Sequence, residues 1–456
     1  MLKRTGRTRI GLLVCAALIA WSTAEAAEFR VNGSTLLPCS NATVGMDRLG
    51  NFVVAWEYQT NIGIQRFGLD GTRQGAEEVW LGQDSPKFRP SVARNASGNY
   101  IVSWKERTTE DAVWVQLFDH MGNPLHSATP VSSSLEDCDP YHHSIIAPQG
   151  NFAVTWTQWN EPSSNFVYVR RYDSGGGEIT PDLVVSVGFN SVGAYDSHGN
   201  LMLAWTSGDI PGGLDVYLRG YNADGTPLGE PRRVGAGGQG RYLPSVASNG
   251  EMFMAAWVEE NSDGNGTGIY ARRFDETGKP IGHKFLVNTT IYGDQLFPRV
   301  ASSPTGQGDF LITWQGPRGA GCEDIQVFAR RFDAAGYPID DEIPVSESGT
   351  DIWPTPAAAM DDSGNFVIVW EALDHPGGES GETVNIYAKR YDYAGEELDD
   401  EPFTAKVPEP LTIILLVPGL AALALAKRKH RRTSDGDRHH YGAQPPRPVG
   451  GPARRW

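Results

Sequence analysis

Residues 244–288 read PSVASNGEMFMAAWVEENSDGNGTGIYARRFDETGKPIGHKFLVN, and this stretch decides the fold. An apolar run begins at Pro244, a turn follows, and a second apolar run ends at Trp257. A polar loop then leads to an alternating run, 269–275, and to a last run, 284–288. Short runs of apolar and β-branched residues, bounded by turn residues, predict strands rather than helices. We interpret this stretch as a unit of four short strands.

The unit occurs seven times, and in each copy the second strand ends on a tryptophan. These tryptophans are Trp56, Trp104, Trp156, Trp205, Trp257, Trp314 and Trp370. A repeat of roughly 40–50 residues with four strands is typical of a propeller blade. One such sheet cannot cover both of its faces, whereas a ring of sheets covers them all and leaves only short edges. The sequence therefore predicts an all-β, seven-bladed β-propeller of four-stranded blades over 28–406, with the tryptophans in the seams between blades.

Closure of the ring is predicted from the start of this region. Residues 28–32 (EFRVN) resemble the fourth strand at 284–288 (KFLVN), although they precede the first unit. We expect this strand to complete the last blade, whose own candidate for the position is 401–405. A linear solenoid is the alternative.

The composition fits an exported β protein. The 456 residues include 53 Gly and 30 Pro, and the formal net charge is −16. Because basic residues gather in 427–456, the predicted propeller itself is acidic. We expect no nucleic-acid partner, since binding phosphates requires the opposite charge.

The N-terminus has the three parts of a secretory signal. Basic residues within 3–9 precede an apolar run, 10–21, and Ala24-Glu25-Ala26 supplies a small-x-small cleavage site. We expect residues 1–27 to form a signal helix that is removed on export. Export permits disulfides, and for Cys39, Cys138 and Cys322 both a Cys39–Cys138 bridge and separate thiols remain open.

A second targeting segment follows the repeats. An apolar run, 411–426, lies between a Pro-Glu-Pro sequence and a basic cluster. Counted from the first proline, the run reaches the lower limit of about 17 residues for a transmembrane helix. The basic cluster would hold its end of the helix in the cytoplasm, so that the propeller would lie outside.

These three parts together resemble the PEP-CTERM sorting signal, which an exosortase recognises in bacteria that make extracellular polysaccharide. The resemblance covers 407–432 and rests on Pro408, Glu409, Pro410, Lys427 and Arg428. It implies an exosortase-type processing enzyme as a partner and passage through the inner membrane. Delivery would be to the cell surface or matrix, with at least transient anchoring through 411–426. A plain transmembrane anchor is the alternative, and residues 433–456 are expected to form a disordered basic tail.

Strand order assigns the loops to two faces. The turns after the first and third strands share one face, and the loops after the second strands share the other with the links between units. The turns are short and repetitive whereas these loops vary, which is typical of a binding surface on a rigid scaffold. The candidate ligand-binding residues in the loops are Trp159, Asp209, Glu259, Asp263, Asp324 and Asp374. Trp159 could stack on a sugar ring or pack within its loop, and the carboxylates could be solvated charges.

No motif of a catalytic, phosphate-binding or metal site is recognisable in the sequence. We expect no catalytic residues and no cofactor. Segment 261–266 is similar in composition to a calcium-binding loop but lacks the spaced carboxylates of such a loop. The paired arginines, such as Arg272-Arg273, point to opposite faces of a strand, so each is expected to bind nearby carboxylates rather than one shared anion.

Our leading hypothesis is a non-catalytic, surface- or matrix-targeted propeller. It would bind extracellular polysaccharide or another envelope component through its variable loops. The alternatives are an extracellular glycoside hydrolase or polysaccharide lyase, and a purely structural matrix protein.

Overall fold

The computed structural model describes residues 28–33, 38–80, 85–107, 111–132, 138–160, 164–208, 213–235, 240–303, 305, 308–321, 324–346, 355–374 and 383–398. The chain divides into two compact units, 1–402 and 403–456, and the described residues all belong to the first. The expected signal helix, sorting segment and tail lie outside them. No helix within the described ranges is long and apolar enough to cross a membrane.

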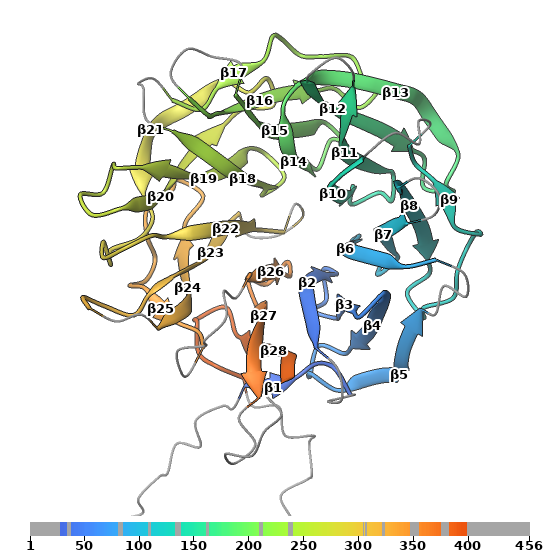
Figure 1. Ribbon diagram of the computed structural model, residues 1–456, viewed down its shortest axis with the longest axis horizontal. Helices are drawn as coiled ribbons and strands as arrows, with labels where there is room; N and C mark the ends of the chain where they lie inside the picture. The colour runs from blue at the N-terminus through green and yellow to red at the C-terminus, as the bar shows by residue number, and fades with distance from the viewer. Residues whose placement is uncertain are drawn as a thin grey trace, which may run out of the picture. The chain divides into compact units, whose positions relative to one another are not determined.

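Seven four-stranded antiparallel sheets stand in a ring around a central channel, as predicted (Figure 1). The first strands of the blades are the innermost: β2 (Cys39–Met46), β6 (Lys87–Arg94), β10 (Cys138–Ile146), β14 (Phe189–Tyr195), β18 (Arg241–Ser248), β22 (Leu296–Ala301) and β26 (Ala357–Met360). The second strands are β3 (Phe52–Tyr58), β7 (Tyr100–Arg107), β11 (Phe152–Asn160), β15 (Leu201–Ser207), β19 (Phe253–Glu260), β23 (Phe310–Pro317) and β27 (Phe366–Asp374).

The third and fourth strands complete each blade toward the rim. The third strands are β4 (Asn61–Phe67), β8 (Asp111–Phe118), β12 (Ser164–Tyr172), β16 (Asp215–Tyr221), β20 (Thr267–Phe274), β24 (Ile325–Phe332) and β28 (Thr383–Tyr391). The fourth strands are β5 (Arg73–Trp80), β9 (Thr129–Pro130), β13 (Glu178–Val187), β17 (Arg232–Arg233), β21 (Pro280–Leu286), β25 (Ile343–Pro344) and β1 (Phe29–Arg30).

The N-terminal strand closes the ring, which confirms the prediction and excludes the solenoid. Strand β1 pairs with β28, with Phe29 opposite Ala388 and Arg30 opposite Tyr387. The pairing continues beyond the strand, because Val31 N donates to the Ile386 carbonyl at 2.7 Å. The last blade is therefore made from both ends of the repeat region.

Each tryptophan fills a seam between two blades, also as predicted. All seven are at most 2% exposed. Trp56 of blade 1 packs with Val369 and Ile386 of blade 7, and Trp104 of blade 2 packs with Val53 and Ile64 of blade 1. The other five tryptophans likewise lie against the blade before their own. Seven apolar clusters at seven seams thus form the core.

Arginines of the third strands add polar joints between blades. Arg273 Nη1 donates to the Ala334 carbonyl in the outer turn of the next blade at 3.1 Å, and Arg272 Nη1 donates back to Val234 of the preceding blade at 3.4 Å. Neighbours on a strand point to opposite faces, so one dipeptide joins two seams. Equivalent forward bonds are made by Arg66, Arg171, Arg331 and Arg390. The expected salt bridges form at Arg170, with Asp182, and at Arg331, with Asp340, whereas Arg272 and Arg273 bind backbone carbonyls.

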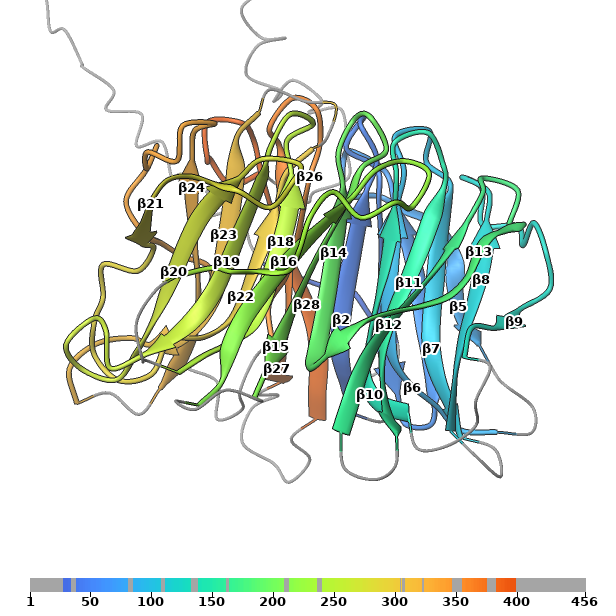
Figure 2. The ribbon, with the colours of Figure 1, turned by 90° about the horizontal axis from the view of Figure 1, so that it is seen from above.

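The strands run between two faces of the ring (Figure 2). We call the side that carries the turns after the first and third strands the turn face. Its turns are regular: at Asp361, the carboxylate accepts bonds from the backbone N–H groups of Ser363 and Asn365 at 2.8 and 2.9 Å. We call the opposite side, with the loops after the second strands and the links between blades, the loop face.

Candidate functional site

A central cavity of about 560 Å³ runs along the inner strands of all seven blades. Its mouth on the loop face is shaped by a β-bulge that recurs near the start of six described inner strands. Five bulge residues adopt left-handed backbone angles, from +50° at Arg89 to +54° at Phe297. Bulges re-aim side chains, and these turn one residue of each blade toward the mouth. The ring of mouth residues comprises Asn41, Arg89, Tyr141, Asn190, Leu243, Phe297 and Thr355.

Aromatic and cationic side chains gather on one side of this mouth. The Arg89 guanidinium of blade 2 lies 4.7 Å from the centre of the Tyr141 ring of blade 3. On blade 2, the guanidinium of Arg107 lies 5.1 Å from the centre of the Phe88 ring. Trp159, on β11 beside the strand of Tyr141, has 42% of its surface exposed, and Tyr141 has 44%. We call these five residues the aromatic strip.

A shallow depression of about 300 Å³ borders the strip between blades 1 and 2. Its wall includes Glu57, whose carboxylate accepts bonds from Arg89 N and Asn41 Nδ2, both at 3.1 Å. Because Glu57 is anchored to two mouth residues, it fixes the backbone that presents the Arg89 side chain.

Glu371 holds the mouth in the same way between blades 7 and 1. Its carboxyl accepts bonds from Thr355 N at 2.8 Å and from Ala42 N at 3.3 Å. Burial raises the pKa of Glu371, and the bonds from Thr355 and the neighbouring backbone only partly oppose this.

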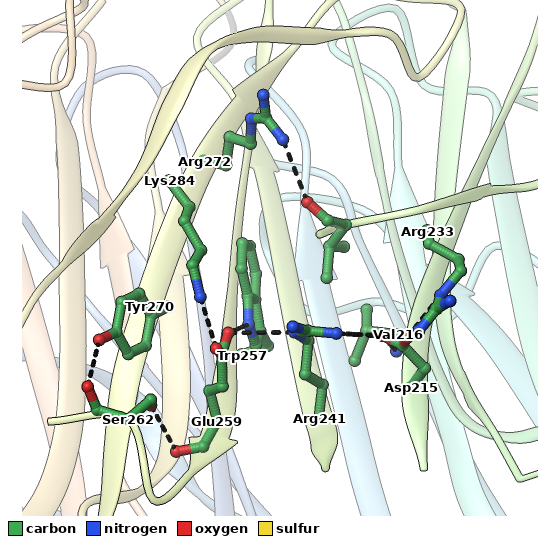
Figure 3. A network of polar contacts seen from close by, with 11 residues as sticks. Asp215, Val216, Arg233, Arg241, Trp257, Glu259, Ser262, Tyr270, Arg272 and Lys284 are labelled. Atoms are coloured by element: carbon green, nitrogen blue, oxygen red, sulfur yellow. Dashed lines mark hydrogen bonds and ion pairs between the residues drawn. The ribbon is translucent and has the colours of Figure 1, made fainter. Parts of the chain in front are cut away.

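The candidate Glu259 lies inside the protein rather than in a loop, because β19 continues to Glu260. Figure 3 shows its carboxylate within a network that joins blades 4 and 5. Arg241 Nε donates to Glu259 at 3.0 Å, and Trp257 Nε1 donates at 3.1 Å. Lys284 also pairs with Glu259, and Arg241 reaches Asp215 at 3.3 Å.

Burial alone would raise the pKa of Glu259. The bonds from Lys284, Trp257 and Arg241 outweigh it and hold the pKa below its ordinary value. Glu259 is therefore an ionised, structural residue that joins two blades, and only 1% of its side-chain surface is exposed to solvent.

The remaining candidates are spread over the loop face. Trp159 lies on β11, Asp374 ends β27, Asp324 is exposed just before β24, and Asp209 lies outside the described residues. Asp263 Oδ1 accepts the backbone N–H of Asn265 at 3.1 Å. The candidates that the structure describes, Trp159, Asp263, Asp324 and Asp374, thus belong to four different blades.

No group of three or more His, Cys, Asp or Glu side chains within the described ranges is arranged to hold a metal ion. In segment 261–266, which suggested calcium, Asp263 is the one carboxylate, and its oxygens accept bonds from Asn265 and from Asn288 at 3.4 Å. Calcium there stays a hypothesis.

Comparison with known proteins assigns no family to this chain. No protein-family model and no curated protein matches the chain. Solved structures with a similar fold include an ulvan lyase of a new polysaccharide lyase family (9% identity, TM-score 0.49, covering 79% of this chain and 95% of that one). They also include an α-L-arabinanase of Penicillium chrysogenum (10%, 0.46, 67% and 93%) and the β-propeller domain of the Trilobed protease of Pyrococcus furiosus (9%, 0.47, 80% and 99%). Glycoside hydrolases and a polysaccharide lyase thus occur among the neighbours, but at these identities and scores the likeness carries no argument about activity.

Proposed function

We propose that this chain is an exported propeller that binds extracellular polysaccharide, or another envelope component, through its loop face without cleaving it. The aromatic strip carries the proposal. Rings of Tyr and Trp with a flat, half-exposed surface bind well to the apolar faces of extended ligands while their polar atoms stay wet. Here Tyr141 and Trp159 lie on adjacent strands of one blade.

The strip is built before any ligand arrives. Arg89 is stacked on Tyr141 and Arg107 on Phe88, so neither cation needs to be ordered on binding. Preorganised side chains lose less conformational entropy on association, and this favours affinity. The guanidinium groups would hydrogen-bond to sugar hydroxyls or carboxylates beside the rings.

Binding to a panel of soluble polysaccharides, such as polygalacturonate, alginate and dextran, tests the proposal in the full chain. Tyr141→Ala and Trp159→Ala are each expected to weaken binding about tenfold, which corresponds to roughly 1.4 kcal/mol. Tyr337→Ala and Tyr393→Ala are matched controls, because each removes an aromatic ring that is 69% exposed on the turn face. Unchanged binding in the Tyr141→Ala/Trp159→Ala double variant, or equal losses in the controls, would contradict the proposal.

The same incubations distinguish the alternatives. New reducing ends would favour a hydrolase over a binding protein. Unsaturated ends, which absorb ultraviolet light, would favour a lyase. Absence of saturable binding to any polysaccharide would favour a structural matrix protein.

The proposed route of export rests on the sequence alone. A signal at 1–27 and a sorting segment at 407–432 would deliver the propeller to the surface or matrix, with an exosortase-type enzyme as processing partner and 411–426 in the membrane until processing. Mass spectrometry of the mature chain tests both ends. We expect a start near residue 27 or 28 and an end near 408–410, whereas an intact C-terminus would favour a plain anchor.

A further inference from the structure

A ring of equivalent residues lies one step inside the mouth of the channel. In each blade this residue pairs with the residue that precedes the blade tryptophan, as Ser91 pairs with Ser103 before Trp104. We call this ring the waist, and it comprises Thr43, Ser91, His143, Val192, Ser245, Arg299 and Ala357. Thr43, Ser91 and Ser245 carry a hydroxyl group. All seven residues of the waist line the cavity. Blades 3 and 6 therefore depart from the repeat by placing His143 and Arg299 here.

Arg299 is a half-buried cation without a carboxylate partner among the residues that the structure describes. Its one hydrogen bond there is from Nη1 to the Pro298 carbonyl, at 3.3 Å. In contrast, Arg94 and Arg241 are buried and each forms a salt bridge, with Asp47 and Asp215. A buried charge that is not paired costs free energy, so a protein rarely keeps one without a use.

The electrostatics of the channel agree with this geometry. Burial lowers the pKa of Arg299, and the carboxylate of Glu371 only partly opposes that effect. Burial, then Arg299, then His142 lower the pKa of His143 to about 3. His143 is therefore neutral near pH 7, and the waist carries one positive charge, that of Arg299.

His143 also has an unsatisfied nitrogen. Its Nδ1 is buried and has no hydrogen-bond partner within the described ranges. Ser91 and Ser245 accept backbone N–H groups of the next blades, from Ser144 and Val300, both at 2.9 Å. Their own O–H groups can then donate, so the waist offers donors beside the cation.

We propose that the channel binds a single carboxylate-bearing sugar unit, a hexuronate, with its carboxylate on Arg299 and a hydrogen bond to His143. The planar guanidinium matches a carboxylate with two parallel bonds. One positive charge balances one carboxylate, whereas a phosphate dianion would leave an excess of negative charge. The cavity volume lies within the range of about 300–1,000 Å³ that is usual for small-molecule sites.

This site lies one step inside the mouth, whereas Arg89 and Tyr141 of the aromatic strip lie at the rim of the same cavity, so each proposal is tested with its own ligands and variants. Titration calorimetry of the full chain with D-galacturonate and D-glucuronate is the test, with D-galactose and D-glucose as uncharged counterparts. We expect the two uronates to bind and the neutral sugars to bind at least tenfold more weakly. Equal binding of charged and neutral sugars, no binding of either uronate, or stronger binding of galactose 6-sulfate would overturn the proposal.

Variants locate the site. Arg299→Gln is expected to weaken uronate binding at least tenfold and His143→Gln severalfold. Arg232→Gln removes the same charge from an exposed edge strand and is expected to change nothing.

Thermal unfolding separates a binding role from a structural one. An unpaired, half-buried cation opposes folding, so Arg299→Gln should leave Tm unchanged or raise it while binding is lost. Added galacturonate should raise Tm in the native chain and not in this variant. A lower Tm in Arg299→Gln, with uronate binding retained, would show that Arg299 serves the fold and would reject the site.

Discussion

Two residues beyond the blade tryptophan, some blades place an acceptor for its buried indole N–H. Trp104 Nε1 donates to Glu106 at 2.9 Å, and Trp257 Nε1 donates to Glu259 at 3.1 Å. In both blades a cation at the start of the first strand completes the group, Lys87 with Glu106 and Arg241 with Glu259. In these two blades the buried indole N–H is thus satisfied by a carboxylate, and the carboxylate is in turn paired with a cation.

Glu259→Gln should destabilise the fold by about 3–5 kcal/mol, because removing one partner of a buried ion pair leaves the other charge partly unpaired. Arg241 would keep its ion pair with Asp215 but lose the one with Glu259. Urea unfolding of the variant measures the loss. Glu260→Gln changes the neighbouring exposed carboxylate and should alter stability by less than about 0.5 kcal/mol; similar losses in both variants would mean that the network is not the cause.

The same carboxylate makes stability depend on pH. Its folded pKa lies below the ordinary value of 4.5, so the unfolded chain takes up the proton first as the pH falls. The stabilisation from Glu259 is therefore complete above about pH 4.5 and is lost as the pH falls through the folded pKa. Urea midpoints between pH 7 and pH 3 should fall less steeply for Glu259→Gln than for the native chain, and parallel profiles would refute this.

Sequence patterns predicted which residues form the core but not which carboxylates are buried. Glu259 looked like a loop residue because it follows the apolar run, and its partner Arg241 lies on another strand. The shared arrangement of Lys87 with Glu106 and of Arg241 with Glu259 was a usable signal. The sequence also contained a signal for Arg299. The motif Pro244-Ser245-Val246-Ala247 recurs as Pro298-Arg299-Val300-Ala301, with arginine in place of serine.

At the level of the strand, a Val-Asn or Val-Ser pair ends several fourth strands in the same way. The valine N–H continues the ladder, and the next side chain accepts a backbone N–H near the start of the third strand. Asn288 accepts from Ile269 N at 2.8 Å in blade 5, and Asn32 accepts from Ile386 N at 2.9 Å in blade 7. This explains why 28–32 resembles 284–288.

Asn32→Ala and Asn288→Ala should each cost about 1–3 kcal/mol, because each leaves a buried N–H without an acceptor. The two variants should differ in how far the loss of structure spreads from the substituted residue. Asn288 lies within continuous chain, whereas Asn32 helps to hold a strand joined to its blade only by non-covalent contacts. Hydrogen exchange should speed up along β28 in Asn32→Ala and stay local in Asn288→Ala; equal spreading would argue against a weak joint at β1.

In blade 4, Gly220 stands where other blades have the arginine that bonds to the next blade, and a direct backbone contact replaces that bond. A Cβ at Gly220 would lie 1.9 Å from the Glu276 carbonyl oxygen of blade 5. Gly220→Ala must push two blades apart, and such overpacking costs about 1–3 kcal/mol. Gly229→Ala, with nothing within 4 Å of the new atom, is the control for thermal unfolding, and comparable Tm values would show that the seam yields freely.

For the whole molecule, the periodicity of the sequence predicted the architecture better than individual residues predicted the chemistry of the channel. Seven similar units with tryptophans at matching places predicted blade number, strand order and the closing strand, because each follows from burial of sheet faces. The channel chemistry could not be predicted this way, since it depends on which blades stand opposite across the ring. His143 and Arg299 are far apart in sequence and line one cavity only when the ring is closed.

A chain that begins at residue 34 tests how far the ring depends on its closing strand. Without β1, the outer edge of β28 loses its partner, and Val31 no longer fills its buried place beside Trp56. We expect a lower Tm and self-association through the exposed strand edge, since unpaired edges pair with other chains. A synthetic peptide of residues 28–33 should restore both Tm and the monomeric state in light scattering, whereas the same peptide with Val31→Asp should not. A truncated chain that stays monomeric with an unchanged Tm would mean that packing at the seam between blades 7 and 1 closes the ring by itself.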